Sequence, residues 1–310
     1  MHAQAWWVAG LCGLCAANVG DRLIDLERGA APAGFQARAL MPPDPSEGVV
    51  YVCPLDPDVR AHEAGTCHRC GRTLAAAVPD PVEYHLDLRV IPSPPQPDRP
   101  AVLQFVVRDP WRDRPVKSFN VVHERLLHTF IVSEDLEFFE HGHPRLVADG
   151  VFQHAIAFPQ AGMFRVAGDY YPTGATPQFT SDTVFLPGPT APPPSRLDRD
   201  YSLKTAENVR VSLATIPEQP VATARTQLRF RAEAPGGLQR FFGEWSHMFA
   251  ASSDLIDMMH EHPLLADGSP QLEFEMVFPR PGAYRLWVQF QSDGIVNTVH
   301  FDVPVAAAAP

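Results

Sequence analysis

Two stretches of this sequence are related to one another, and this internal repeat constrains the possible fold more than any other feature. Residues 128–144 align without a gap on residues 247–263, with eight of the 17 positions identical. Downstream, further pairs of segments share the patterns A-D-G and F-P-x-x-G-x-[FY]: 148–150 with 266–268, and 158–164 with 278–284. Internal similarity of this kind indicates that one structural unit is present twice.

Each copy has the pattern of a β-sandwich. Apolar and polar residues alternate over short segments, which predicts strands, and no long amphipathic helix interrupts them. The 33 prolines favour many turns, and 310 residues exceed one ordinary core. We predict a mainly β protein with two tandem immunoglobulin-like sandwiches at 83–188 and 200–306. Phe105, Phe130, Phe158 and Phe164 fall on alternating positions and are predicted to be core residues.

A compact cysteine-rich unit precedes the sandwiches at 49–80. All five cysteines lie in the first 70 residues, and Cys67-x-x-Cys70-Gly71 predicts a tight knuckle that Cys53 joins from the preceding turn. A unit this small can bury little apolar surface. A bound metal would therefore supply its folding energy. Zn²⁺ or Cu⁺ suits three thiolates, and His68, His62 or a group from elsewhere in the chain would be the fourth ligand. The alternative is a disulfide that joins Cys67 to Cys53 or Cys70.

The knuckle resembles the heavy-metal-binding domain that accompanies copper and silver efflux components. That family shows Y-x-C-P-M-H-P-x-V and then G-x-C-P-x-C-G-M-x-L, and residues 51–74 match at most of these positions. Leu55, Asp56, His68 and Arg72 replace the family's Met, His, Pro and Met. The resemblance implies capture of a transition metal, with an envelope protein such as an efflux component as partner.

Each sandwich also carries a set of three histidines. His141 and His143 are two residues apart, so on a strand both imidazoles face one side. His128 lies on the preceding predicted strand, with His123 and Asp135 nearby, and the second copy repeats the set as His247, His260 and His262. Three neutral imidazoles suit Zn²⁺ or Cu²⁺, and the neighbouring Met248, Met258 and Met259 would favour Cu⁺. The alternative is that these histidines fix local turns, as Asp135 and Asp254 also could.

The sandwich pattern is also similar to YtkA-like extracytoplasmic domains, through D-L-x(4)-H-x-H-P and F-P-x-x-G-x-[FY]. An H-x-H pair on a sandwich strand is similar to the ligands of copper/zinc superoxide dismutase, but the spacing elsewhere differs. G-x-S-x-G, a phosphate loop and H-E-x-x-H are all absent, so we expect no enzyme.

The first 20 residues read as a signal peptide or a hydrophobic N-terminus. Residues 5–17 are apolar but too short to span a bilayer, which takes about 20 residues. A linker at 21–48 follows, and a net charge of −11 argues against nucleic acid as a partner. We therefore predict a periplasmic or secreted protein that binds, sequesters or delivers zinc or copper. The alternative is a protein-interaction scaffold with a structural zinc knuckle.

Overall fold

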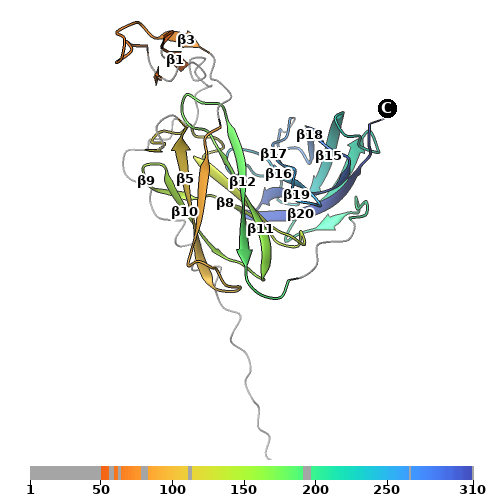
Figure 1. Cartoon of the computed structure of the whole chain (residues 1–310). Helices are drawn as coiled ribbons and strands as arrows, with labels where there is room; N and C mark the ends of the chain where they lie inside the picture. The colour runs from red at the N-terminus through yellow and green to blue at the C-terminus, as the bar shows by residue number, and fades with distance from the viewer. Residues whose placement is uncertain are drawn as a thin grey trace, which may run out of the picture. The chain divides into compact units, whose positions relative to one another are not determined.

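The computed structural model describes residues 50–55, 59–61, 64–77, 83–110, 114–190, 197–264 and 267–308. Every regular element among them is a β-strand, which confirms the predicted fold class (Figure 1). These residues include no helix with the length and apolarity needed to cross a membrane. The predicted signal peptide and linker lie outside the described residues.

The cysteine-rich unit forms a small three-stranded antiparallel sheet. Strand β1 (Val50–Val52) lies between β2 (Arg60–Ala61) and β3 (Ala75–Ala77). Its apolar cluster consists of four buried residues: Cys53, Val59, Cys67 and Leu74. A cluster this small supplies little hydrophobic stabilisation, so the unit needs another source of folding energy.

The first sandwich consists of two antiparallel sheets. One contains, in spatial order, β4 (Leu86–Ile91), β5 (Pro100–Asp109), β10 (Val151–Ala157) and β9 (Arg145–Ala148), with β6 (Arg114–Pro115) paired to β5. The other contains β12 (Gln178–Leu186), β11 (Gly162–Tyr170), β7 (Leu127–Ser133) and β8 (Phe139–Gly142). The proline-rich segment after residue 91 connects the antiparallel strands β4 and β5.

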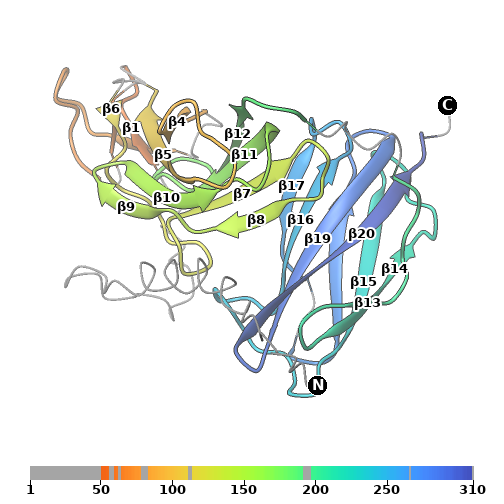
Figure 2. The ribbon, with the colours of Figure 1, turned by 90° about the horizontal axis from the view of Figure 1, so that it is seen from below.

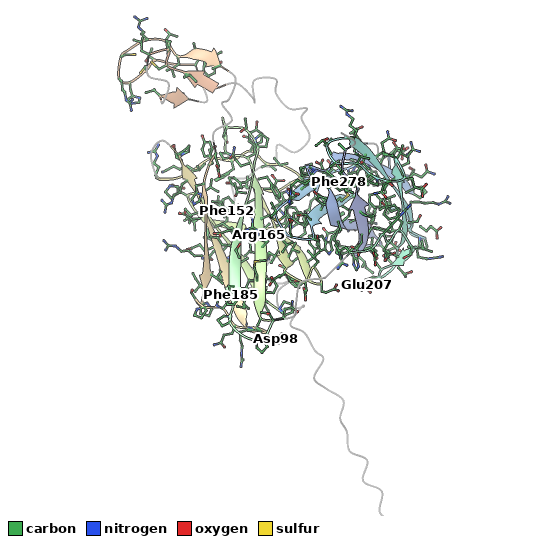
Figure 3. The ribbon with its side chains drawn as sticks, turned by 45° about the vertical axis from the view of Figure 1, so that its right-hand side comes forward. Asp98, Phe152, Arg165, Phe185, Glu207 and Phe278 are labelled. Carbon is green, nitrogen blue, oxygen red and sulfur yellow. The ribbon has the colours of Figure 1, made fainter. Side chains whose placement is uncertain are left out.

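The second sandwich repeats this plan. One sheet contains β13 (Lys204–Thr205), β14 (Arg210–Ile216), β15 (Arg225–Glu233) and β18 (Gln271–Val277). The other contains β17 (Met258–Glu261), β16 (His247–Ser252), β19 (Gly282–Ser292) and β20 (Ile295–Val305), which run side by side in Figure 2. Phe152 in the first sandwich and Phe278 in the second, both fully buried, belong to the two separate cores (Figure 3).

Strands β7 and β16 lack the alternation of buried and exposed residues that a strand such as β15 shows. In β15 buried and more exposed residues alternate, as expected for a strand with one face in solvent. In β7 and β16, by contrast, every residue is buried. Leu127 and Ile131 of β7 enter the first core, whereas Phe130 and Val132 belong to a third cluster that also contains Phe249 of β16. These strands therefore pack on both faces.

The third cluster joins the two sandwiches. The rings of Phe130 and Phe249 stack at 4.5 Å between centroids, and those of Phe139 and Trp287 stack at 4.9 Å. Phe130, predicted as core, thus packs between the sandwiches. Next to these aromatic pairs, Arg285 of the second sandwich donates to the Leu136 carbonyl and to the Glu137 carboxylate of the first. His128 and His247 occupy the same strand faces as Phe130 and Phe249, two residues earlier.

Candidate metal centres

The three cysteines of the knuckle converge. Their sulfur atoms all lie within 4.8 Å of one another, and Cys53 Sγ is 3.4 Å from Cys70 Sγ. The loop is closed by backbone hydrogen bonds from Cys67 N to the Arg72 carbonyl and from Gly71 N to the Cys67 carbonyl. Gly71 has a φ of 72°, a left-handed conformation that glycine adopts without strain. No disulfide links these cysteines, so the alternative of a disulfide-closed knuckle is wrong for this structure.

The three knuckle thiols lie close enough to affect the protonation of Cys70. A backbone hydrogen bond at Arg72 lowers the pKa of Cys70. Desolvation and the nearby Cys53 and Cys67 outweigh it, and they raise that pKa to about 11. A bound cation would reverse this effect, because thiolates are the form that ligates metal. His68, a predicted fourth ligand, is exposed and lies outside the three-sulfur group, and His62 lies outside the described residues.

The histidines form two groups of three, as the repeat predicts. We name His128, His141 and His143 the first histidine group, and His247, His260 and His262 the second. Within each group, one ring nitrogen per residue lies within 4.8 Å of the other two. The strand pairing explains this convergence: β7 pairs with β8 and β16 with β17, so His141 and His260 lie next to the strands that carry His128 and His247.

A backbone carbonyl sets the tautomer of the strand histidine in each group. His128 donates from Nε2 to the Val122 carbonyl at 3.1 Å, and His247 donates from Nε2 to the Phe241 carbonyl at 3.0 Å. Each acceptor lies six residues before its histidine, so the second copy repeats the arrangement. Since Nε2 carries the proton, Nδ1 of both strand histidines presents a lone pair to its group.

The first histidine of each H-x-H pair is oriented from the opposite sandwich. His141 donates from Nδ1 to Oε1 of Gln289 at 2.8 Å, and His260 donates from Nδ1 to Oδ2 of Asp169 at 2.8 Å. In this orientation of the Gln289 amide, its Nε2 donates to the Thr298 hydroxyl. The Nε2 atoms of His141 and His260 therefore carry lone pairs. A ligating imidazole usually has this kind of outer hydrogen bond.

These tautomers place lone pairs against one another. In the first group, Nδ1 of His128 lies 3.1 Å from Nε2 of His141, and with the Gln289 amide in this orientation neither atom has a proton to donate. Nε2 of His143 is buried, and it contacts no hydrogen-bond partner within the part of the chain that the structure describes. In the second group, Nε2 of His260 is likewise buried and without a partner there. In the second group, Nε2 of His262 lies 3.0 Å from Nδ1 of His247 and can donate to it. A cation at the centre of each group would satisfy the nitrogens that lack a partner.

Burial keeps the imidazoles neutral. Desolvation lowers the pKa of all six, and the neighbouring histidines lower the pKa of His141, His143, His260 and His262 further. For His247 the pKa falls to about 3, because burial outweighs the hydrogen bond to Phe241. Neutral imidazole is the ligating form, so no proton must leave these rings before metal binds at neutral pH.

An aromatic ring from the opposite sandwich covers the outer histidine of each group. The ring of His123 lies 3.7 Å from that of His262, and the ring of Phe242 lies 3.9 Å from that of His143. His123 and Phe242 directly follow the two carbonyl acceptors, and both adopt a left-handed φ, of 48° and 51°. Both rings therefore separate the histidine groups from the surroundings.

Sequence reasoning missed several residues around the groups. It named His123 only as a neighbour and did not identify Asp169, Gln289 or the two carbonyls. Asp169 and Gln289 occupy equivalent places in the repeat, opposite His128 and His247 in the strand register. That equivalence is the only signal in the sequence that could have found them.

The predicted soft neighbours lie elsewhere: Met248 and Met259 pack in the second core and Met258 in the cluster between the sandwiches. Asp135 and Asp254 cap turns, where each carboxylate accepts a backbone N–H two residues ahead.

Comparisons with known proteins identify a domain and similar structures. The sequence model of a family described as "Domain of unknown function (DUF8832)" matches residues 204–307. A search of curated proteins finds no match.

Among solved structures, the adhesin InvE of Yersinia pseudotuberculosis is 11% identical, with coverage of 71% of this chain and 59% of its own and a TM-score of 0.22. The Escherichia coli adhesin FdeC is 12% identical over 77% and 70%, with a TM-score of 0.25. A two-domain fibronectin type III segment of chicken tenascin is 10% identical over 71% and 98%, with a TM-score of 0.22. This chain therefore spans less than two thirds of InvE, and none of these likenesses assigns a function.

Proposed function

We propose that this protein binds transition-metal ions for sequestration or delivery, with one ion in each histidine group and one in the knuckle. One observation carries the proposal: Nδ1 of His128 and Nε2 of His141 lie 3.1 Å apart, and each points a lone pair at the other. The Val122 carbonyl fixes the tautomer of His128, and Oε1 of Gln289 sets that of His141, so a cation between the rings would satisfy both nitrogens.

The donor atoms favour Zn²⁺ or Cu²⁺ in the histidine groups. Each group offers three imidazole nitrogens, which suit these dications, and the nearby methionines pack into apolar clusters. Three ligands leave one tetrahedral position for water or for a donor from a partner, and an ion held in this way can be passed on. Location outside the cytoplasm and an efflux component as partner stay predictions from the N-terminal sequence and the knuckle resemblance.

The knuckle also supports a more limited role. Cys53 and Cys67 are 0% and 2% exposed and form half of the unit's apolar cluster, so a zinc ion here would hold the fold together. A structural zinc ion would resist chelators and would not exchange with copper. Ions in the histidine groups would exchange more readily. A measurement of exchange with copper or a chelator therefore distinguishes metal delivery from a structural role.

Elemental analysis tests the proposal. Protein purified without chelator or added metal, then loaded with Zn²⁺ and desalted, is expected to hold up to three ions per chain. His141→Ala/His143→Ala and His260→Ala/His262→Ala are each expected to lose one ion, and Cys67→Ser to lose the knuckle ion. His85→Ala is the matched control, because this side chain is 73% exposed and lies outside both groups.

Circular dichroism distinguishes a lost ligand from a lost fold. A variant counts only if it keeps the wild-type β spectrum, and the milder His143→Gln and His262→Gln replace either double variant that does not. Zinc content that is unchanged in folded variants of both histidine groups would contradict the proposal.

A further inference from the structure

The surroundings of the two histidine groups differ in charge, and we propose that they fill in order, the second group before the first. The inference rests on the proposed function, because it assumes that both groups bind a dication. It is carried by two pairs of residues that occupy equivalent positions in the repeat but differ in charge.

The first pair is the outer hydrogen-bond partner of each H-x-H histidine. His260 of the second group donates to the Asp169 carboxylate, whereas His141 of the first group donates to the Gln289 amide, both at 2.8 Å. The geometry is the same, so the difference is one of charge. A carboxylate partner makes the imidazole a stronger donor and offsets part of the charge of a bound dication, and an amide does neither.

The second pair lies behind the covering rings. Arg125 places its guanidinium 4.5 Å from the ring centroid of Phe242, the ring that covers His143 of the first group. The equivalent residue in the second copy is Glu244, and its carboxylate lies 3.3 Å from Nδ1 of His123, the ring that covers His262. The ring that covers the first group therefore contacts a cation, and the ring that covers the second group contacts an anion.

Both differences act in one direction. The outer partner of the second group is a carboxylate and a second carboxylate lies behind its covering ring, whereas the first group has an amide partner and a cation behind its covering ring, while the three nitrogen donors are the same. In a largely buried site such charges are weakly screened and act strongly on a dication. Asp169 also lies opposite His128 in the strand register, so its charge reaches the first group as well, but only through space.

Isolated groups provide the test. In a Cys67→Ser background, His141→Ala/His143→Ala leaves only the second group and His260→Ala/His262→Ala leaves only the first. Zn²⁺ affinity is measured for each by competition with a chromophoric chelator. The second group is expected to bind at least about tenfold more tightly, a difference in the range that outer-shell partners cause.

Charge substitutions that keep the hydrogen bond sharpen the test. Asp169→Asn is expected to weaken the isolated second group by about 10- to 100-fold, and the first group by less. Gln289→Glu is expected to strengthen the first group, with Gln227→Glu on the exposed side of β15 as control.

Equal affinities of the two isolated groups, or an equal loss in both on Asp169→Asn, would overturn the ordered filling and leave metal binding intact. If neither isolated group binds Zn²⁺ while the proteins remain folded, the proposed function itself fails.

Discussion

The turn after β7 in the first sandwich has the same backbone as the turn after β16 in the second, but different side chains stabilise the two turns. In both copies a serine hydroxyl donates to the turn aspartate, Ser133 to Asp135 and Ser252 to Asp254. In both a leucine follows with a left-handed φ, 63° at Leu136 and 54° at Leu255. The backbone of the turn is thus the same, and only its supports differ.

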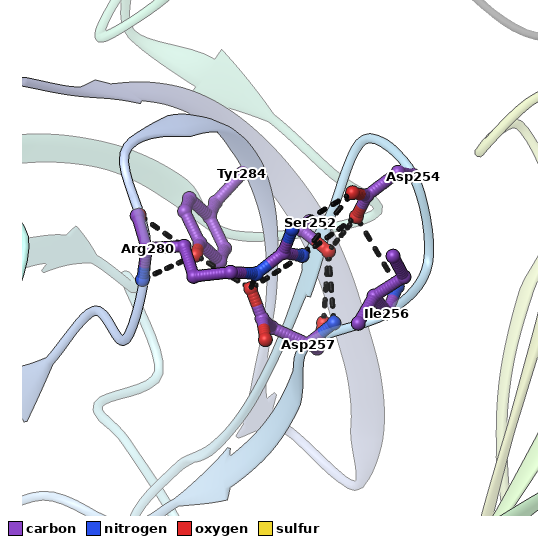
Figure 4. Close-up of polar contacts among 6 residues, drawn as sticks. All are labelled: Ser252, Asp254, Ile256, Asp257, Arg280 and Tyr284. Carbon is purple, nitrogen blue, oxygen red and sulfur yellow. Dashed lines mark hydrogen bonds and ion pairs between the residues drawn. The ribbon is translucent and has the colours of Figure 1, made fainter.

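In the second sandwich the support is polar (Figure 4). Arg280 donates to the carboxylates of Asp254 and Asp257, and the Tyr284 hydroxyl lies 2.9 Å from Asp257 Oδ2. In the first sandwich Gln160 takes the place of Arg280 and donates to Asp135 at 2.8 Å.

The other two residues of the network become apolar in the first sandwich. Phe138 and Phe164 replace Asp257 and Tyr284, and their rings meet edge to face at 5.9 Å.

The difference teaches what each part of the repeat must preserve. A turn needs only enough stabilisation, and either an aromatic pair or an ion-pair network supplies it. A ligating imidazole needs one tautomer and one orientation, and in both copies these come from the same carbonyl six residues earlier. The supports of the turn have changed, and so has the outer partner of the first H-x-H histidine, whereas the backbone carbonyl that orients the strand histidine has been kept.

The largest expected effect is the loss of the aromatic support. Phe164 is fully buried, so Phe164→Ala should lower the free energy of unfolding of the first sandwich by about 3–5 kcal/mol. Urea unfolding followed by circular dichroism measures it. Phe185→Ala is the control, because Phe185 is 60% exposed on β12. Similar losses for the two variants would show that the aromatic pair is not the main support.

Metal binding should stabilise both sandwiches despite their different turns. Zn²⁺ at about 100 times its Kd should add about 2.7 kcal/mol per occupied histidine group, since only the folded state presents the converging nitrogens. Thermal unfolding with and without Zn²⁺ measures this shift, and His143→Gln/His262→Gln should abolish most of it. An equal shift in that variant would assign the stabilisation to another site.

Removal of one hydroxyl should have a smaller effect. Tyr284→Phe, which installs the residue of the first sandwich, should cost about 1 kcal/mol through the lost hydrogen bond to Asp257. Burial and Asp257 raise the pKa of Tyr284 to about 12, so the variant should also reduce the tyrosine transition near pH 12, to which Tyr170 contributes as well. A double-mutant cycle with Asp257→Asn isolates the pair, and zero coupling would show that the contact adds nothing.

The ion pair to Asp254 should have the smallest effect, and that effect should depend on pH. Burial raises the pKa of Asp254, but hydrogen bonds from Arg280 and Ser252 outweigh it and lower that pKa to about 2. The carboxylate therefore stabilises the fold above about pH 4, and this contribution is lost as the pH falls towards 2. Arg280→Gln should lower the unfolding midpoint slightly at pH 6 and hardly at pH 2. A difference that grows on acidification would contradict this assignment.

Much of the fold followed from local pattern. Strands such as β4 and β15 show the alternation that predicts one buried face, and the structure confirms them. The pattern could not reveal that β7 and β16 are buried on both faces, because a second buried face depends on what packs against it. For this reason Phe130 was predicted as core of its own sandwich, although it packs against the other one.

The sequence alone determined the β repeat, the convergence of three sulfur atoms in the knuckle and the two sets of three histidines. Each of these depends on short-range geometry: a tight turn within C-x-x-C, or the two-residue period of a strand. Only the tertiary structure decided which ring nitrogens are free to bind a metal. The hydrogen bonds from His260 to Asp169 and from His141 to Gln289 join residues 91 and 148 positions apart, and they form because the sandwiches pack against each other.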